Sequence, residues 1–311
     1  MSQKITRFKT DYDAGAFTPD GALGLGYTAP FTAAVKALQA QVAALQTPPG
    51  TGVGTIGTFP GTYGSSMANF VTALSDMSID TLQVTGGTYS NWHDLALNMD
   101  RTARPLLVQP VGANVIWDGN GGSGDGIFYL GWGGTACRWV KFDSAGTGYD
   151  FQINNFVLGQ EGLIDTDWAE NCQFNGFDCT GTTATYNDMT AWHVYCSSDG
   201  TYQGLNLTFN NWSADSSSTS GGYQSNGLQF YHAPGPSNVT ANNWTTTDGH
   251  WGVVGRVGTG LNFSGWTITG ANTPFDCGGA SGTVKNMTST GSTNSPIIDG
   301  GMVDGGGNSW A

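Results

Sequence analysis

The fold is decided by five stretches that share one pattern: FQINNFVL at residues 151–158, CQFNGFDC at 172–179, LTFNNWSA at 207–214, VTANNWTT at 239–246 and LNFSGWTI at 261–268. In each stretch positions one and three are apolar or small, position five is Asn or Gly, and position six is aromatic. GTVKNMTS at 282–289 is a degraded sixth copy with Met287 at the aromatic position. The aromatic positions are 21, 35, 32, 22 and 21 residues apart, which indicates a period near 21 residues with two insertions.

The Asn or Gly at position five predicts a sharp corner inside each copy. Side chains alternate along a strand, so a straight strand would leave the aromatic residue at position six in water. Asn and Gly tolerate the left-handed backbone conformation, and one such residue turns the next side chain inward again. We therefore expect a buried aromatic column and, at the corner, an asparagine ladder. The column comprises Phe156, Phe177, Trp212, Trp244 and Trp266, and the ladder comprises Asn155, Asn211 and Asn243.

A further strand lies between successive copies. The candidates are WHVYC at 192–196, LQFYH at 228–232, WGVVG at 251–255 and SPIID at 295–299. Three strands in a turn of about 21 residues predict an all-β fold, a right-handed parallel β-helix with three strands per rung, over residues 59–311. An alternating β-sandwich is the other interpretation, but it gives no reason for a fixed period.

The first part of the chain has a different pattern. Residues 28–46 read as a short helix that Thr28 caps and that carries Pro30 in its first turn. Its apolar residues are spaced 4, 3, 4 and 3 apart, which predicts a coiled-coil seam or a face packed on the β-helix: Phe31, Val35, Leu38, Val42 and Leu45. Residues 47–58 read as a Gly/Pro linker, and residues 1–27 as an attachment segment.

The composition limits the classes of partner. Only 11% of the 311 residues are charged, and the net charge is −13. The first 50 residues contribute +1 and the remainder −14, so a phosphate backbone would be repelled and nucleic acid is not an expected partner. The N-terminus shows no apolar signal region and no run has the length of a membrane span, so neither export nor a membrane partner is expected.

Two other segments carry a resemblance to a known family. MANFVTALSD at 67–76, IDTLQVTGGTY at 79–89 and ARPLLVQPVGANVIWDG at 103–119 resemble the entry segment and first strands of the pectate-lyase-like superfamily. That resemblance implies the β-helix fold. It leaves the activity open, because the scaffold carries lyases, hydrolases and inert spikes.

The order of segments is similar to that of bacteriophage tailspikes, tail fibres and capsid-attached fibres. This resemblance implies a homotrimer in the virion, held to a capsid or tail protein by residues 1–27 and possessing no enzymatic activity. Proteins of this kind can also bind host-surface glycans, so a glycan is one ligand that the resemblance allows. The alternative is a polysaccharide lyase or glycoside hydrolase on the same scaffold, and a third interpretation is a bacterial surface adhesin.

The residues of the body favour the non-enzymatic interpretation. A uronate lyase needs a base and a cation or metal, but residues 59–311 hold six basic residues and the whole chain only two glutamates. No metal site, cofactor site or catalytic residue is predicted. The densest acidic cluster is expected to lie in a connecting loop, and it contains an aromatic residue that could stack on a sugar. The candidate carbohydrate-binding residues are therefore Asp165, Asp167, Trp168 and Glu170.

Overall fold

The computed structural model describes residues 54–120, 123–124, 126–158, 162–179, 183–184, 188–194, 204–215, 224–230, 235–247 and 251–311. Residues 54–311 form one compact unit. The predicted attachment segment and the helix with its seam of Phe31, Val35, Leu38, Val42 and Leu45 lie outside the described residues, so both stay predictions. The first described strand, β1 (Ile56–Phe59), lies across the predicted boundary between linker and β-helix.

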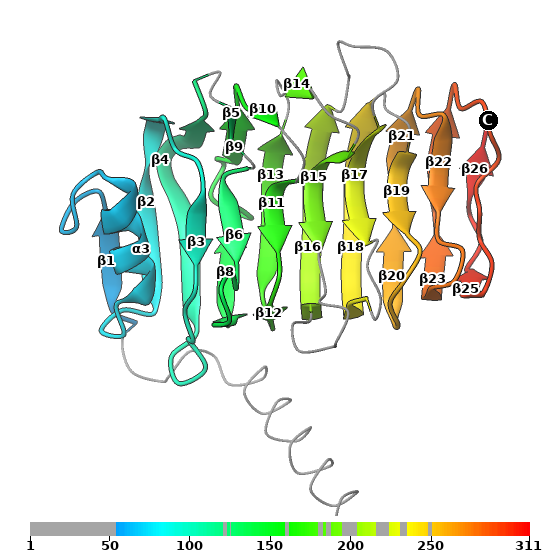
Figure 1. Cartoon of the computed structure of the whole chain (residues 1–311). Coiled ribbons are helices and arrows are strands. Elements are labelled where there is room, and N and C mark those ends of the chain that lie inside the picture. The colour runs from blue at the N-terminus through cyan, green and yellow to red at the C-terminus, as the bar shows by residue number, and fades with distance from the viewer. Residues whose placement is uncertain are drawn as a thin grey trace, which may run out of the picture. The chain divides into compact units, whose positions relative to one another are not determined.

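The chain forms a parallel β-helix, as the repeat predicts (Figure 1). Ten strands of the largest sheet follow one another in chain order: β1, β2 (Thr81–Ser90), β4 (Leu106–Asp118), β8 (Val140–Asp143), β13 (Gln173–Cys179), β16 (Gly204–Asp215), β18 (Ser237–Thr247), β20 (Leu261–Ser264), β23 (Ser281–Lys285) and β25 (Gly301–Asp304). Six further strands pair within the same sheet: β7 (Cys137–Arg138), β9 (Phe151–Asn154), β12 (Ala169–Glu170), β21 (Thr267–Thr269), β24 (Thr288–Thr290) and β26 (Ser309–Trp310).

Two other sheets complete the rungs, a rung being one full turn of the β-helix. The second sheet contains β3 (Leu95–Leu97), β6 (Phe128–Leu130), β11 (Gly162–Thr166), β15 (Asp188–Val194), β17 (Gln224–Phe230), β19 (Trp251–Gly255) and β22 (Thr273–Asp276). The third contains β5 (Ser123–Gly124), β10 (Val157–Leu158) and β14 (Thr183–Ala184). The prediction of a strand at 295–299 is wrong, because Ile297 makes only an isolated parallel bridge to Asp276 at the end of β22. The strand β22 itself was not predicted.

A helix lies at the N-terminal end of the β-helix beside β1 and β2 (Figure 1). It is α3 (Met67–Ser75), and the Oγ of its N-cap Ser66 accepts a hydrogen bond from the Asn69 amide at 3.1 Å. Its Phe70 packs edge-on against Phe59 at 5.1 Å and lies 5.3 Å from the ring of Trp92, which is buried. The helix therefore covers the apolar interior of the first rungs, in agreement with the predicted entry segment.

The rungs turn at asparagines, as predicted. Nine of the eleven non-glycine residues with positive φ among the described residues are Asn, with φ between 52° and 62°. Asn243 donates to Asn211 at 3.2 Å, and Asn211 donates to Asn175 at 2.5 Å. The prediction that Asn155 belongs to this ladder is wrong, because Asn155 turns a different corner and Asn175 takes its place.

Aromatic rings form a stacked column inside the β-helix, and the predicted column needs one correction. Trp212, Trp244 and Trp266 are buried and stack with centroid distances of 4.9 and 4.6 Å and interplanar angles of 6° and 4°. Below them Phe177 stacks on Phe151, not on Phe156. Phe156 is buried but precedes β10, after the next corner, so the 21-residue spacing from Phe156 to Phe177 does not mark equivalent positions.

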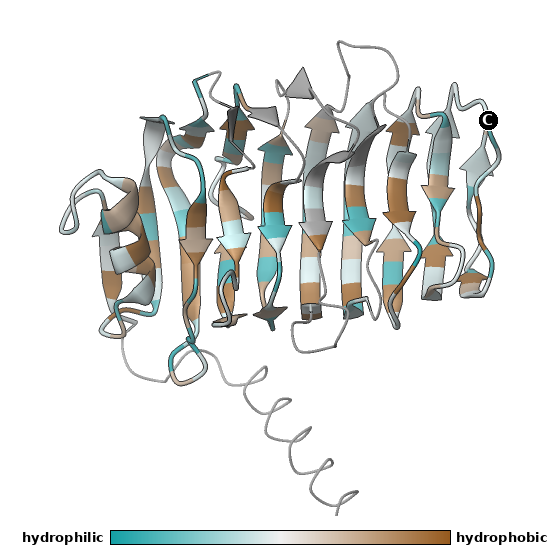
Figure 2. Ribbon diagram, viewed as in Figure 1, coloured by the Kyte–Doolittle hydropathy of each residue, from teal (hydrophilic) through white to brown (hydrophobic). Residues whose placement is uncertain are grey.

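Hydrophobic residues recur at matching levels along successive strands (Figure 2). In β18 the burial alternates so that Val239, Ala241 and Trp244 point inward while Asn243 and Thr245 are exposed. The cysteines Cys137, Cys172, Cys179 and Cys277 are buried thiols. Burial raises the pKa of the Cys179 and Cys277 thiols well above the ordinary value, as expected for thiols inside an apolar core.

Candidate functional site

The site is formed by a seven-residue loop at one corner of the β-helix. At the same corner the neighbouring rung turns with a single glycine. β8 pairs with β13 through Asp143 and Asn175, and β9 resumes the pairing at Phe151 and Phe177. Between these pairs, β13 passes the corner with Gly176 alone, whereas the rung below uses residues 144–150, SAGTGYD. The loop therefore projects from the corner of an otherwise regular stack.

The loop holds its shape through its own hydrogen bonds. The Thr147 hydroxyl donates to the Ser144 carbonyl at 2.7 Å, and it accepts from the Tyr149 amide at 3.1 Å. The Asp150 amide donates to Asn114 Oδ1 at 3.0 Å, which attaches the end of the loop to β4. Gly146 and Gly148 have φ of 75° and 78°, a conformation that glycine adopts without strain.

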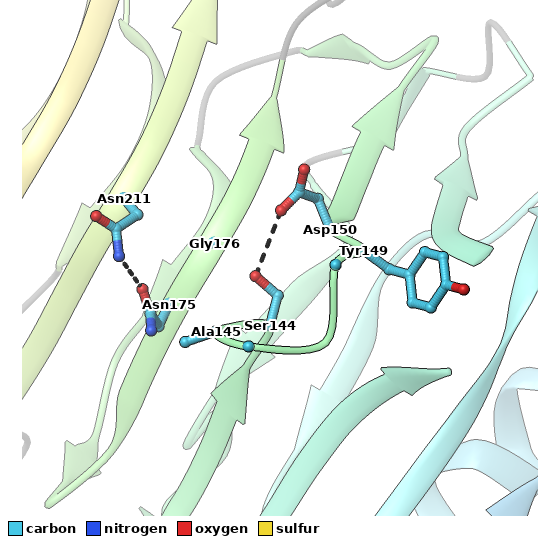
Figure 3. Close-up of a pocket in the computed structure, with 9 residues that line it drawn as sticks. Ser144, Ala145, Tyr149, Asp150, Asn175, Gly176 and Asn211 are labelled. Carbon is cyan, nitrogen blue, oxygen red and sulfur yellow. Dashed lines mark hydrogen bonds between the residues drawn. The ribbon is translucent and has the colours of Figure 1, made fainter. Parts of the chain in front are cut away.

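A pocket of about 410 Å³ lies between this loop and the next two rungs (Figure 3). This volume falls within the range of small-molecule sites. The lining residues come from the loop and from β13 and β16: Ser144, Ala145, Gly146, Gly148, Tyr149, Asp150, Asn175, Gly176 and Asn211. Figure 3 shows Ser144, Asp150, Asn175 and Asn211 around the pocket, with the Tyr149 ring projecting away from the two asparagines.

Gly176 keeps the floor of the pocket open. Its φ is +78°, and a Cβ built there would lie 1.7 Å from Ser144 Oγ. Any side chain at this position would therefore displace Ser144, and Ser144 is the residue whose hydroxyl donates to Asp150 Oδ1 at 3.4 Å. The corner glycine of one rung thus makes room for the hydroxyl of the rung below.

The two carboxylates at the ends of the loop, Asp143 and Asp150, differ in their ion-pair and hydrogen-bond partners. Asp143 is held by Lys141 at 2.7 Å and by Asn175 Nδ2 at 2.7 Å, so its charge and acceptors serve the structure. Asp150 is exposed, and no lysine or arginine in the described ranges forms an ion pair with it. Asp150 is consequently the lining carboxylate that can accept hydrogen bonds from a ligand.

This arrangement can hold a hydroxyl-rich molecule. An ionised carboxylate accepts hydrogen bonds from hydroxyl groups, and an asparagine amide both donates and accepts. Asp150, Ser144, Asn175 and Asn211 therefore offer mixed donors and acceptors, with the Tyr149 ring at the margin of the pocket. Hydrolysis of a glycosidic bond ordinarily needs a pair of carboxyl groups, whereas Asp150 supplies the single carboxylate among the lining residues.

The sequence-predicted site residues lie elsewhere. Asp165 is in β11 of the second sheet, where it is buried and in register with Tyr129 and His193. Glu170 is in β12 of the largest sheet. The expectation that the acidic residues share one connecting loop is therefore wrong, since only Asp167 and Trp168 lie between these two strands.

Trp168 and Glu170 do come together, in an ion-pair cluster. Glu170 receives two hydrogen bonds from Arg138, at 2.8 and 3.1 Å, and one from Trp168 Nε1 at 2.7 Å. The Arg138 guanidinium lies 5.2 Å from the centre of the Trp168 ring and also donates to Asp100 at 3.1 Å. Arg138 thus occupies both oxygens of Glu170, which makes this cluster a clamp between rungs. Sugar binding by the predicted candidates Asp165, Asp167, Trp168 and Glu170 stays a prediction.

The clamp gives a testable pH dependence. The hydrogen bonds from Arg138 are the main cause that lowers the pKa of Glu170, so the folded value lies below the unfolded value. The pair therefore stabilises the fold above the unfolded pKa, and this stabilisation is lost as pH falls through the folded pKa. We expect Glu170→Gln to lower the melting temperature at about pH 7, and we expect this difference from the parent chain to shrink as the pH is lowered towards about 3. Circular dichroism melts over this range measure it, and a difference that persists undiminished at the acidic end would contradict the assignment.

Two kinds of site are not found in the described part of the chain. Its ranges contain no cluster of three His, Cys, Asp or Glu side chains that could hold a metal ion. No helix of residues 54–311, where described, is long and apolar enough to cross a membrane.

Of the comparisons with known proteins, the one with solved structures found similar chains. No family model matches the chain, and no curated protein does. An endopolygalacturonase I from Stereum purpureum, complexed with two galacturonate, is 14% identical over 74% of this chain and 96% of its own, with a TM-score of 0.33. The catalytic domain of a GH87 α-1,3-glucanase in complex with nigerose is 10% identical over 85% of this chain and 70% of its own, with a TM-score of 0.21. At these values the neighbours assign no activity to this chain.

Sequence reasoning missed the loop of residues 144–150. Its signal is the run SAGTGYD between the alternating stretches VKFD and FQIN, with two glycines and an aspartate, which is typical of a turn. The repeat pattern hid that signal, because FQINNFVL offers an aromatic residue at both Phe151 and Phe156.

Proposed function

We propose that this protein recognises a carbohydrate, and that the pocket between the loop of residues 144–150 and the corner asparagines is the sugar-binding site. The observation that supports the proposal most is the exposed Asp150 carboxylate beside Ser144, Asn175 and Asn211 in a cavity of about 410 Å³. The β-helix beneath the pocket supplies a rigid support, because stacked rungs fix the spacing of the asparagines that line it.

The charge of the site favours a neutral or amino sugar over a uronate. No lysine or arginine among the described residues forms an ion pair with Asp150, and the chain as a whole carries −13. A uronate would place a second carboxylate beside Asp150, and like charges repel in a partly desolvated site. The proposed ligand class is therefore a neutral or amino-sugar-containing surface glycan.

The expected virion role stays a separate proposal. Its determinants, the attachment segment and the seam for a homotrimer, fall in residues 1–46 and so outside the described residues. The rigid β-helix and the sugar pocket are compatible with a host-binding fibre, and they serve equally as the binding half of a glycan-active enzyme. Glycoside hydrolysis is therefore one outcome of the binding experiment.

The experiment is calorimetric titration of the full chain with neutral, amino-sugar and uronate oligosaccharides. Removing the Asp150 charge with Asp150→Asn should weaken binding by about tenfold or more, since a hydrogen bond to a charged group is worth about 1.5–3 kcal/mol. Ala145→Trp, which fills the pocket from an exposed position, should abolish binding. Asp304→Asn, at an exposed carboxylate in β25, is the control and should bind like the parent chain.

Three results would overturn the proposal. One is that no oligosaccharide binds. Another is that uronates bind best, and the third is that Asp150→Asn and Asp304→Asn behave alike. If the parent chain releases shorter sugars from an oligosaccharide and Asp150→Asn abolishes this release, the proposal would extend from binding to hydrolysis.

A further inference from the structure

The asparagine ladder beside the pocket has a fixed direction. Asp143 is a carboxylate, which accepts hydrogen bonds and cannot donate them, so Asn175 must turn its Nδ2 toward Asp143, at 2.7 Å. The Asn175 Oδ1 then faces the next rung, where it accepts from Asn211 Nδ2 at 2.5 Å. The Asn211 Oδ1 accepts in turn from Asn243 Nδ2 at 3.2 Å. The carboxylate at the first rung therefore sets the orientation of each amide that follows.

This ladder leaves one N–H of each pocket asparagine for a ligand. Among the described residues, Asn175 Nδ2 and Asn211 Nδ2 each donate one hydrogen bond, and a side-chain amide nitrogen carries two hydrogens. The hydrogen used in the ladder lies antiparallel to the C=O of the same planar amide, so the second hydrogen points away from Cβ and out of the rung. Both carbonyl oxygens already accept from the next rung. The pocket therefore offers two outward N–H donors about 4.8 Å apart.

The acceptor of the pocket lies on its other side. Figure 3 shows Asn175 and Asn211 on one side of Ser144 and Asp150 on the other. The Asp150 carboxylate accepts from the Ser144 hydroxyl at 3.4 Å and has further lone pairs for a ligand. A group that fits between the two sides must therefore present an acceptor to the asparagines and a donor to Asp150.

A secondary amide has this arrangement. It is planar and trans, so its C=O and N–H point in opposite directions from one rigid unit. A hydroxyl group can accept from an asparagine, but it then has a single hydrogen and is too small to reach across to the carboxylate. The methyl group of an acetamido substituent also finds room, because four of the lining residues have no polar side-chain atom: Ala145, Gly146, Gly148 and Gly176.

We infer that the pocket selects a sugar that carries an acetamido group. The acetamido carbonyl accepts from the outward N–H groups of Asn175 and Asn211, and its N–H donates to Asp150. A sugar with a free amine would satisfy Asp150 and leave the asparagine donors without an acceptor. This inference rests on the proposed function, since it names the class of sugar that the same pocket takes.

The test compares sugars that differ in the substituent at C2 alone. The full chain is titrated calorimetrically with tetramers of N-acetylglucosamine, glucosamine and glucose, and with the methyl glycosides of the three galacto-configured counterparts. In at least one series the acetamido member should bind about tenfold or more tightly than the amine and hydroxyl members. Such a preference is expected because only the acetamido group joins a hydrogen bond to a charged carboxylate with an acceptor for the asparagines.

A pair of glycine variants tests the role of the ladder. Asn211→Gly removes one outward donor, and glycine adopts the corner conformation of Asn211, φ 58°, without strain. It should weaken binding of the acetamido sugar about two- to tenfold. The matched control is Asn206→Gly in the same strand: Asn206 has φ 54°, donates to Asn171 at 2.8 Å and accepts from Asn238 at 3.1 Å, in a ladder that does not line the pocket. This variant should bind like the parent chain, and circular dichroism melts show that both variants are folded.

The outcomes separate this inference from the proposed function. Binding of the amine or hydroxyl member as tight as that of the acetamido member would overturn the inference and leave sugar recognition standing. Equal binding by Asn211→Gly and Asn206→Gly would overturn it as well. If no sugar of either titration binds to the folded parent chain, the proposed function itself fails, and the inference fails with it.

Discussion

Replacing Trp244 by alanine is expected to lower the free energy of unfolding by about 3–5 kcal/mol, the range for a large aromatic residue removed from a packed core. Trp244 is fully buried and stacks between Trp212 and Trp266. Its removal leaves a cavity and also deprives both neighbours of a stacking partner, at about 0.5–1.5 kcal/mol for each pair. Urea unfolding measures the loss.

A second substitution at this position separates stacking from hydrogen bonding. Trp244 Nε1 donates to the Phe209 carbonyl at 3.1 Å, and Trp212 and Trp266 make the same bond to Phe174 and Ala241. Trp244→Phe keeps a stacked ring and leaves the buried carbonyl without its donor, so it should cost about 1–3 kcal/mol. Equal destabilisation by Trp244→Ala and Trp244→Phe would show that the column contributes little through stacking.

The second large effect is expected at a glycine. Gly282 has φ +152°, and a Cβ built on it would lie 1.8 Å from the Leu261 carbonyl oxygen of the rung below. That oxygen belongs to the backbone of β20 and cannot move without breaking the stack. Gly282→Ala should therefore destabilise the chain by more than about 4 kcal/mol, which is exceptional for one substitution, or prevent folding.

Gly87 supplies the matched control. Its φ is +142°, close to that of Gly282, but a Cβ built there meets nothing within 4 Å. Gly87→Ala should consequently show the backbone strain alone, about 1–3 kcal/mol. Melting temperatures and soluble yields of the two variants give the comparison. Equal effects would mean that the close stacking of β23 on β20 is not the cause.

The repeat was readable from the sequence because stacking repeats a local pattern. Trp212, Trp244 and Trp266 fall on equivalent positions, since every rung must turn at the same place and fill the same space. The pattern becomes ambiguous in a rung whose shape differs from that of the rungs beside it. Phe151 and Phe156 both satisfy the pattern, and the choice between them depends on the pairing of Asp143 with Asn175, which is a long-range contact.

The site was harder to predict for the same reason. The loop of residues 144–150 interrupts the repeat, so the periodicity of the sequence carries no information about Ser144 or Asp150. The acidic cluster at 165–170 looked compact in sequence, but a strand end separates Asp165 from Glu170 and puts them in different sheets. Arg138, the partner of Glu170, is 32 residues away in the chain and one rung below in space.

The central claim is that residues 144–150 and the adjacent corner asparagines bind a sugar, and hydrogen exchange with the best oligosaccharide from the titration tests it most directly. The loop lies outside the strand pairing and is exposed at four of its seven residues, so its amides should exchange faster than those of the strands in the free protein. Bound sugar should slow exchange of the amides in 144–150 and at Gly176, with no change at 165–170. Protection confined to 165–170, or the absence of protection in the loop at saturating sugar, would contradict the claim.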